Sequence, residues 1–317
     1  MVISLAPLQG YTEYPYRNAL AQIIGGVTRF YTPYLRFEND GTLRSKHIKD
    51  ISPDNNKNIN VIPQILVNNS PDFLKLARII EEYGYTQVNW NLGCPYPMVA
   101  KRQLGSGLLP LLEKVSRVLD EVIPNTNLNI SIKLRSGYEL DTDINKLIGI
   151  FNQYPLNEII YHPRIGKQLY KGTADSDKFA EISALSKHNL AYNGDIDSFA
   201  KYTEICTKFP LVNHVMIGRG LIANPFLGLE INDGKPLDDD IKRKLFEEFH
   251  QSLFLHFSNK LSGDSHLLNK FVHFWEYFSH LFVDNKRVNK TIKKNKTIVE
   301  FKRNAQFIIR NSGFASF

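Results

Sequence analysis

The sequence predicts an α/β protein, a (β/α)₈ TIM barrel in residues 1–236 followed by a small helical bundle in residues 237–317. Runs rich in Val, Ile, Tyr and Thr, which are typical of strands, alternate with helical patterns as far as Pro225. Eight such runs in roughly 225 residues match the length and the pattern of this barrel. Beyond Pro225 the strand-like runs stop, and apolar residues such as Leu245 and Phe249 recur at helical spacing.

Turn and cap residues indicate where the elements begin and end. Gly25 is expected to stop the first helix, Ser70 to cap the second and Asp197 to cap a later one. The polar residues 35–60 predict a loop with a short helix near 41–47. The expected strands are 2–8, 27–34, 61–67, 86–92, 128–134, 158–162, 189–192 and 212–217, and the expected helices between them are 15–24, 70–83, 111–123, 143–154, 177–187 and 197–208.

Polar side chains lie in or directly after seven of the eight predicted strands. The carboxyl ends of all strands meet at one mouth in a barrel, whereas an open sheet would keep most of them apart. This distribution favours the barrel over a doubly wound sheet. The residues concerned are Gln9, Gln64, Cys94, Lys133, His162, Asn193, Asp195 and Arg219, with Gly194 and Gly218 in the same loops as the last three.

Most of the net charge of +7 lies at the C-terminal end of the chain. Residues 1–240 contain 25 basic and 26 acidic side chains, whereas residues 241–317 contain 14 and 6. Such asymmetry indicates a polyanionic partner for the C-terminal segment, although a solvated helix face would carry the same charges.

Composition is ordinary for a soluble globular protein, with 43% hydrophobic and 22% charged residues. No apolar run is long enough to predict a membrane span, and the N-terminal residues lack the basic region of a signal peptide. Cys94 and Cys206 are too few for a disulfide framework or a structural zinc site. We therefore expect a cytoplasmic protein, monomeric, with neither a membrane partner nor a metal.

Cys94 and Lys133 are the first candidates for chemistry. Gly93 permits a sharp turn and Pro95 stiffens the exit, so the thiol of Cys94 would be presented at a strand end. A free cysteine is also a common buried hydrophobic residue, and Cys94 alone leaves both interpretations open. Lys133 lies between apolar residues of a predicted central strand, where it is either a lysine that extends its amine to solvent or, as we favour, a fixed cation that would stabilise an anionic cofactor or transition state.

Gln64 and His162 are weaker candidates. A buried amide such as that of Gln64 needs hydrogen-bond partners, which the edge of a heterocycle supplies. His162 ends a predicted strand, where a structural histidine and one that transfers protons are equally common. The sequence contains no zinc-type spacing, no Ser/His/Asp nucleophile pattern and no phosphate-loop or dinucleotide fingerprint.

Two glycine-containing loops predict a phosphate site. Asn193-Gly194-Asp195 and Gly218-Arg219-Gly220 follow the seventh and eighth strands, where many barrels bind phosphate through backbone N–H groups. Arg219 would add charge-assisted hydrogen bonds. Because a carboxylate repels phosphate, Asp195 is expected to cap the next helix or to contact a sugar-like hydroxyl.

These motifs together resemble those of the tRNA-dihydrouridine synthases. The resemblance covers most of residues 4–228, with the same motifs in the same order. They are Ala6-Pro7-Leu8-Gln9-Gly10 with Arg17, Asn91-Leu92-Gly93-Cys94-Pro95 with Gly105-Ser106-Gly107, Lys133-Leu134-Arg135-Ser136-Gly137, His162-Pro163-Arg164 with Tyr170-Lys171-Gly172, Asn193-Gly194-Asp195-Ile196, and Met216-Ile217-Gly218-Arg219-Gly220.

The resemblance implies an FMN enzyme that uses NADPH to reduce the C5–C6 double bond of selected tRNA uridines. Hydride would pass from flavin N5 to uracil C6, and Cys94 would donate a proton to C5. The implied flavin contacts are Pro7, Leu8, Gln9, Gln64, Lys133 and His162 for the ring, and Asn193, Gly194, Asp195, Gly218 and Arg219 for the ribityl phosphate. The implied tRNA contacts are Asn91, Arg164, Lys286, Arg287, Lys293 and Lys294.

Two alternative functions use fewer of these residues. An FMN barrel oxidoreductase acting on a small molecule would share the phosphate site but would not need the basic C-terminal segment. A tRNA-binding barrel without catalysis would not need Cys94 or Lys133.

Overall fold

The computed structural model describes residues 1–140 and 144–315, which form two compact units. The first unit contains most of the expected barrel, and the second contains the C-terminal helices with two shorter segments. The first comprises Met1–Gly10, Thr28–Asp195 and Cys206–Met216, and the second comprises Tyr11–Val27, Ile196–Ile205 and Ile217–Phe317.

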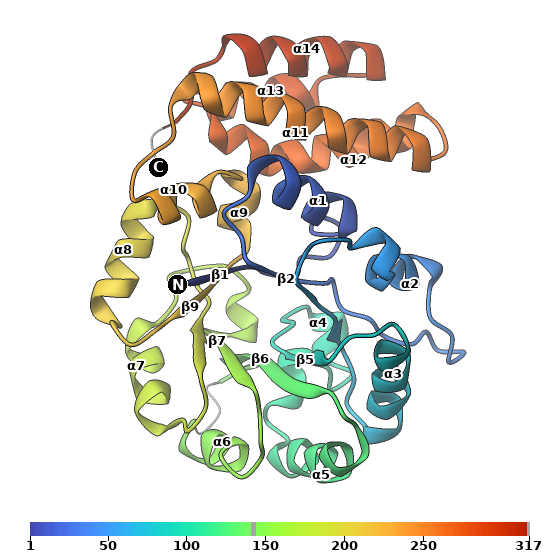
Figure 1. Cartoon of the computed structure of the whole chain (residues 1–317), viewed down its shortest axis with the longest axis vertical. Coiled ribbons are helices and arrows are strands. Elements are labelled where there is room, and N and C mark those ends of the chain that lie inside the picture. The colour runs from blue at the N-terminus through green and yellow to red at the C-terminus, as the bar shows by residue number, and fades with distance from the viewer. Residues whose placement is uncertain (141–143, 316–317) are drawn as a thin grey trace. The chain divides into compact units, whose positions relative to one another are not determined.

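A parallel sheet forms the core of the first unit (Figure 1). Within the described part of the chain the sheet has nine short strands. Hydrogen-bonded strands follow one another in the order β3-β2-β1-β9-β8-β7-β6-β5-β4. β3 (Val61–Ile62) and β4 (Gln64–Ile65) are the two halves of one expected strand, interrupted at Pro63. β3 pairs with β2 and β4 pairs with β5, so this interrupted strand joins both ends of the sheet. The sheet is thereby closed, and the predicted (β/α)₈ barrel is confirmed.

The other strands differ from the expected ones mainly in length. The first two are shorter than expected, whereas β6 and β7 continue further. β7 passes through Pro163, where an end at His162 was expected, and its pairing with β6 shifts there between Arg135 and Gly137. Such an irregularity accommodates a residue that lacks an N–H group. The remaining strands are β1 (Val2–Leu5), β2 (Arg29–Tyr31), β5 (Gln87–Leu92), β6 (Asn129–Gly137), β7 (Glu158–Ile165), β8 (Leu190–Tyr192) and β9 (His214–Ile217).

Helices between the strands cover the outside of the sheet in Figure 1. Asn69 caps α3 by accepting from the Asp72 N–H, so the cap lies one residue before the expected Ser70. Ser198 accepts from the N–H of Lys201 near the start of α8, where Asp197 was expected as the cap. The helices are α2 (Ser45–Ile51), α3 (Ser70–Glu82), α4 (Pro97–Ala100), α5 (Leu112–Val122), α6 (Ile144–Phe151), α7 (Ser176–Leu185) and α8 (Phe199–Lys208); the expected helix start at 143 lies outside the described residues.

A buried polar network joins four strands near their amino ends. The Glu158 carboxylate lies 2.6 Å from Nδ1 of His214 and 3.1 Å from a guanidinium nitrogen of Arg29. Nε2 of His214 lies 2.7 Å from the Ser4 hydroxyl. Because each buried polar group has a partner, this end of the barrel interior holds charge without an unpaired ion.

The second unit is helical, and its core is rich in aromatic side chains. Phe271, Phe274 and Phe278 are buried on one helix, α12, and form part of this core. A buried ion pair of 2.8 Å between Lys242 and Glu230 joins α11 to α10. The helices are α1 (Tyr14–Ala19) with a π-helical extension (Leu20–Ile24), α9 (Arg219–Ala223), α10 (Leu227–Asp233), α11 (Asp239–Lys260), α12 (Asp264–Phe278), α13 (Asn285–Lys293) and α14 (Ile298–Asn311).

The expected domain boundary between residues 236 and 237 falls in the turn between α10 and α11. Across residues 1–140 and 144–315, no helix has both the length and the apolar character needed to cross a membrane.

Candidate active site at the strand ends

The loop after β5 holds the backbone of Cys94 from both sides. The Asn91 side-chain oxygen accepts from the N–H of Gly93 at 3.0 Å and from that of Cys94 at 2.8 Å. The Cys94 carbonyl accepts from the backbone N–H of Ser106 at 3.1 Å and from its hydroxyl at 2.9 Å. A Cβ on Gly105 would lie only 2.6 Å from that carbonyl oxygen, so only glycine permits this approach.

The thiol itself is buried, with only 7% of Cys94 exposed. It packs with Leu66 and Leu104, and the Tyr34 hydroxyl and the backbone of Tyr96 act to lower its pKa. Burial is the largest influence and raises the pKa of the Cys94 thiol above its ordinary value. The sulfur therefore carries its proton at neutral pH.

A chain of side-chain amides continues from Cys94 into the barrel. Asn91 donates to Gln64 at 2.7 Å, Gln64 donates to Asn89 at 2.7 Å, and Asn89 donates to the Ser131 hydroxyl at 2.9 Å. An amide nitrogen carries two N–H groups, so Gln64 and Asn91 each keep one that no described residue accepts. Both side chains are thus fixed and retain one donor for a ligand.

Lys133 shares the interior face of the barrel with these amides. It pairs with Asn91 across β5 and β6 and lies two residues after Ser131, so its side chain points to the same side. Its amine has no hydrogen-bond acceptor within residues 1–140 and 144–315. Burial, together with the nearby guanidinium of Arg135, lowers the pKa of Lys133 to about 7. A half-buried amine without an acceptor is suited to a ligand that supplies one.

His162 and Arg164 belong to a second network, which also contains Asp195. Arg164 is 2% exposed and donates to both carboxylate oxygens of Asp195, at 2.8 and 2.5 Å. It also donates to Nε2 of His162 at 3.0 Å and to the Gly172 carbonyl at 2.7 Å. The Asp195 carboxylate also accepts from the Ala174 N–H, and the expected helix cap or sugar contact of Asp195 stays a prediction. The substrate role of Arg164 stays a prediction.

The two expected phosphate loops lie in different units. In the first unit, Asn193 donates to the Met216 carbonyl at 2.7 Å, and a Cβ on Gly194 would lie 2.7 Å from the Cβ of Ala174. In the second unit, Gly218 immediately precedes α9, which begins at Arg219. The first loop is tightly constrained, and the joint binding of one phosphate by both loops stays a prediction.

The first strand leads to Pro7, Leu8 and Gln9, which were expected to contact the flavin. Leu8 is half-buried and packs on the cluster formed by Ala6 and its neighbours. The Gln9 amide donates to the Tyr34 carbonyl at 3.2 Å. Gln9 therefore fixes the backbone of the residue whose hydroxyl contacts the thiol.

The basic residues of the second unit that were expected to contact tRNA lie on α13 and in the turn after it. Lys286, Arg287, Lys293 and Lys294 are all exposed. Lys293 forms an ion pair with Glu276 at 3.0 Å, which neutralises part of its charge.

Sequence reasoning missed Tyr34, Asn89 and Ser131. Tyr34 ends the run 27–34 that the sequence predicts as a strand, so the rule that identified the other strand-end residues applies to it as well. Asn89 and Ser131 alternate with apolar residues in their strands, which is a pattern for side chains that face a barrel interior.

Comparison with known proteins gives the family. The model of the family described as "Dihydrouridine synthase (Dus)" matches residues 4–312. The chain belongs to the dihydrouridine synthase family. The tRNA-dihydrouridine synthase B of Pasteurella multocida is 26% identical over 230 residues, covering 71% of this chain and 67% of that protein. A probable tRNA-dihydrouridine synthase of Helicobacter pylori is 27% identical over 250 residues, covering 77% of this chain and 74% of that protein.

Solved structures agree on the fold of this dihydrouridine synthase family member. The old yellow enzyme from Trypanosoma cruzi superposes with a TM-score of 0.54 at 12% identity, covering 74% of this chain and 89% of that one. Morphinone reductase in complex with tetrahydroNAD gives a TM-score of 0.53 at 12% identity, covering 74% and 87%. At this identity the likeness concerns the barrel alone.

Proposed function

We propose that this chain is a tRNA-dihydrouridine synthase that reduces the C5–C6 double bond of selected uridines, with FMN as cofactor and NADPH as reductant. One observation carries the proposal: in a member of this family, a buried thiol follows the carboxyl end of β5, and a half-buried amine without an acceptor lies on the adjacent strand β6, opposite Asn91. This end of the barrel is where such enzymes place their chemistry.

The interior of the barrel fits the polar edge of a flavin. The Lys133 amine lacks an acceptor and the Gln64 amide keeps one donor, which together match the carbonyl and nitrogen acceptors of an isoalloxazine ring. We propose that Gln64 and Lys133 hold this edge, with Leu8 on one face of the ring and His162 beside it. When bound, FMN reduced by NADPH supplies the hydride that adds to uracil C6.

Cys94 then provides the proton for C5 in this proposal. A general acid must be protonated before it donates, and the raised pKa of the Cys94 thiol keeps it so at neutral pH. Asn91 holds the backbone of Cys94 and retains one N–H for a uracil carbonyl. The target base must leave its stack to reach a thiol that is 7% exposed.

We propose residues 237–317 as the domain that docks tRNA through its phosphates. The exposed Lys286, Arg287 and Lys294 on and after α13 would contribute most, because Lys293 already pairs with Glu276. Contacts to phosphates position an RNA without reading its sequence.

The test is to incubate the purified protein with unmodified tRNA and NADPH and to measure dihydrouridine by mass spectrometry of nucleosides. We expect product from the wild type, and a loss of about 100-fold or more in single-turnover rate for Cys94→Ala, with FMN and tRNA binding retained. Cys206→Ala is the matched control, since it removes the other free cysteine.

Two results would contradict the proposal. Equal single-turnover rates in wild type and Cys94→Ala would remove the acid role. NADPH oxidation with small unsaturated carbonyl compounds, without any dihydrouridine in tRNA, would instead support a small-molecule oxidoreductase.

A further inference from the structure

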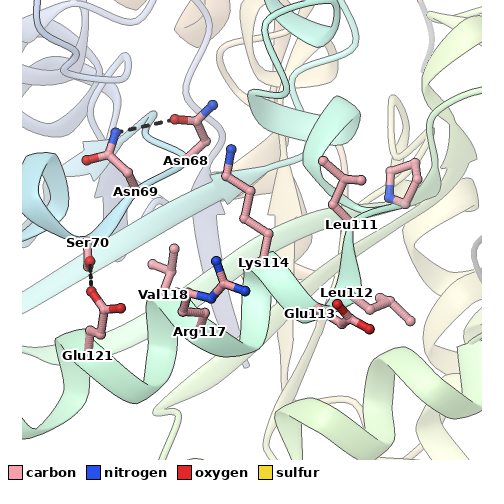
Figure 2. Close-up of a pocket in the computed structure, with 11 residues that line it drawn as sticks. Asn68, Asn69, Ser70, Leu111, Leu112, Glu113, Lys114, Arg117, Val118 and Glu121 are labelled. Carbon is pink, nitrogen blue, oxygen red and sulfur yellow. Dashed lines mark hydrogen bonds between the residues drawn. The ribbon is translucent and has the colours of Figure 1, made fainter.

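A cavity of about 560 Å³ opens between the β4–α3 loop and α5 in the first unit (Figure 2). Ligand sites in proteins commonly have volumes of roughly 300 to 1,000 Å³. Leu111 and Val118 give it apolar walls, while Asn68 and Arg117 are polar residues on its lining. The cavity, called the α3–α5 pocket here, therefore combines an apolar surface with a few hydrogen-bonding groups.

Two cations project into this pocket from α5. Figure 2 shows Lys114 and Arg117 one turn apart, with Lys114 pointing toward Asn68. The Lys114 amine donates to the Gln103 side chain at 2.9 Å and keeps further N–H groups. Arg117 is exposed, and no described residue accepts a hydrogen bond from its guanidinium. Both side chains can bind a phosphate.

Glu113 and Glu121 lie one turn before and one turn after Arg117 on α5, and within the described residues neither forms an ion pair with Arg117 or Lys114. Glu121 accepts a short hydrogen bond from the Ser70 hydroxyl at one end of the pocket. Glu113 is exposed and lies near Leu112 in Figure 2, at the opposite end from Glu121. An anion placed between Lys114 and Arg117 would contact two cations that no carboxylate of the described residues pairs with, and Glu121 would accept from an N–H of a bound base.

The pocket is connected to the loop of the thiol. Lys114 binds Gln103, and the Asn68 amide donates to the Arg102 carbonyl at 2.9 Å. Leu104, which follows Gln103 in the chain, packs against Cys94. The segment 102–104 thus contacts the pocket through its polar groups and the thiol through Leu104.

We propose that the α3–α5 pocket binds one nucleotide of the tRNA other than the target uridine. Its phosphate would lie between Lys114 and Arg117, and its base against Leu111 and Val118. This inference rests on the proposed function and extends it by naming a second RNA site on the barrel unit. A nucleotide within an RNA fits better than a free dinucleotide, because the exposed Lys101 and Arg102 continue the row of cations toward the Cys94 loop, as consecutive phosphates require.

The experiment uses two pocket variants, the single variant Arg117→Ala and the double variant Lys114→Ala/Arg117→Ala. The control is Arg78→Ala, because Arg78 is an exposed arginine on α3 that does not line the pocket. We expect the Kd for unmodified tRNA to rise about 5-fold for the single variant and about 20-fold for the double one, with a lower salt dependence. Flavin content, the KM for NADPH and the turnover at saturating tRNA should stay unchanged. Arg78→Ala should bind tRNA like the wild type.

A photocrosslinking residue at Glu113, an exposed position on the pocket lining, supplies the second measurement. We expect its crosslinks to map to one nucleotide of the tRNA that is not the reduced uridine. Unchanged Kd in both pocket variants, a rise in the KM for NADPH in place of the Kd, or crosslinks scattered over the tRNA would overturn the inference. Absence of dihydrouridine with the wild type would count against the proposed function alone, because the Kd comparison and the crosslinks are measured without turnover.

Discussion

Replacement of Lys133 by Met should stabilise the flavin-free protein at neutral and acidic pH. The pKa of Lys133 is about 7 in the folded chain, against an ordinary 10.5 in the unfolded one. Below pH 7 the amine is charged in both states, and folding bears the full cost of burying that charge. The difference in pKa sets this cost at about 5 kcal/mol as an upper limit, and relaxation of the site should reduce it to about 1–3 kcal/mol.

The sign of the pH dependence follows from the number of bound protons. Between pH 7 and 10.5 the unfolded chain binds more protons at Lys133 than the folded chain, so the wild type gains stability as pH rises. Lys133→Met has no such amine. The free energy of unfolding of the variant minus that of the wild type should therefore be largest below pH 7 and should shrink steadily above it.

Urea unfolding of the flavin-free wild type and of flavin-free Lys133→Met between pH 6 and pH 9.5 measures this difference. Subtracting the two free energies of unfolding cancels the contributions of the titratable groups that both proteins share. A difference that does not change with pH, or a variant less stable than the wild type at pH 6, would refute the reasoning. A bound flavin should reverse the order. Its acceptor atoms favour the charged amine, so the wild type should retain FMN and Lys133→Met should lose it.

The other predictions concern the thiol and the tRNA surface. Tyr34→Phe removes the hydroxyl that lowers the pKa of Cys94, so we expect a rate about 5-fold lower and an alkaline limb of the pH–rate profile shifted to higher pH. Tyr96→Phe is the control, because it removes an exposed hydroxyl on the loop that carries Cys94. An alkaline limb of the pH–rate profile that does not shift in Tyr34→Phe would show that Tyr34 only fills space. Charge reversal at both Lys293 and Lys294 should weaken tRNA binding about 10-fold at physiological salt without changing flavin content, with Lys294 alone giving most of the effect because Lys293 is paired with Glu276. Gel-shift or anisotropy titrations measure this, and equal affinity of wild type and double variant would exclude this surface as the docking site.

The sequence by itself determined the barrel, the helical character of the C-terminal segment and the places where polar groups leave the strands. Strand and helix patterns are local, so they can be read without knowing which segments meet. The position of Cys94 after Gly93 and that of Lys133 in an apolar strand are likewise local features. The predicted first and last residues of the helices and strands were less accurate, because a helix cap such as Asn69 depends on one hydrogen bond to the backbone.

Only the tertiary structure decided what each polar residue contacts. Asn91 and Gln64 are 27 positions apart and bind each other, which turns two expected ligand contacts into one fixed chain of amides behind the thiol. Arg164 and Asp195 are 31 positions apart and form an ion pair, although the family resemblance implies a ligand contact for each of them. Tyr34 reaches Cys94 across the β2 and β5 strand ends. A hydrogen bond forms only when two groups come within about 3 Å, and closure of the barrel sets those distances for residues far apart in the chain.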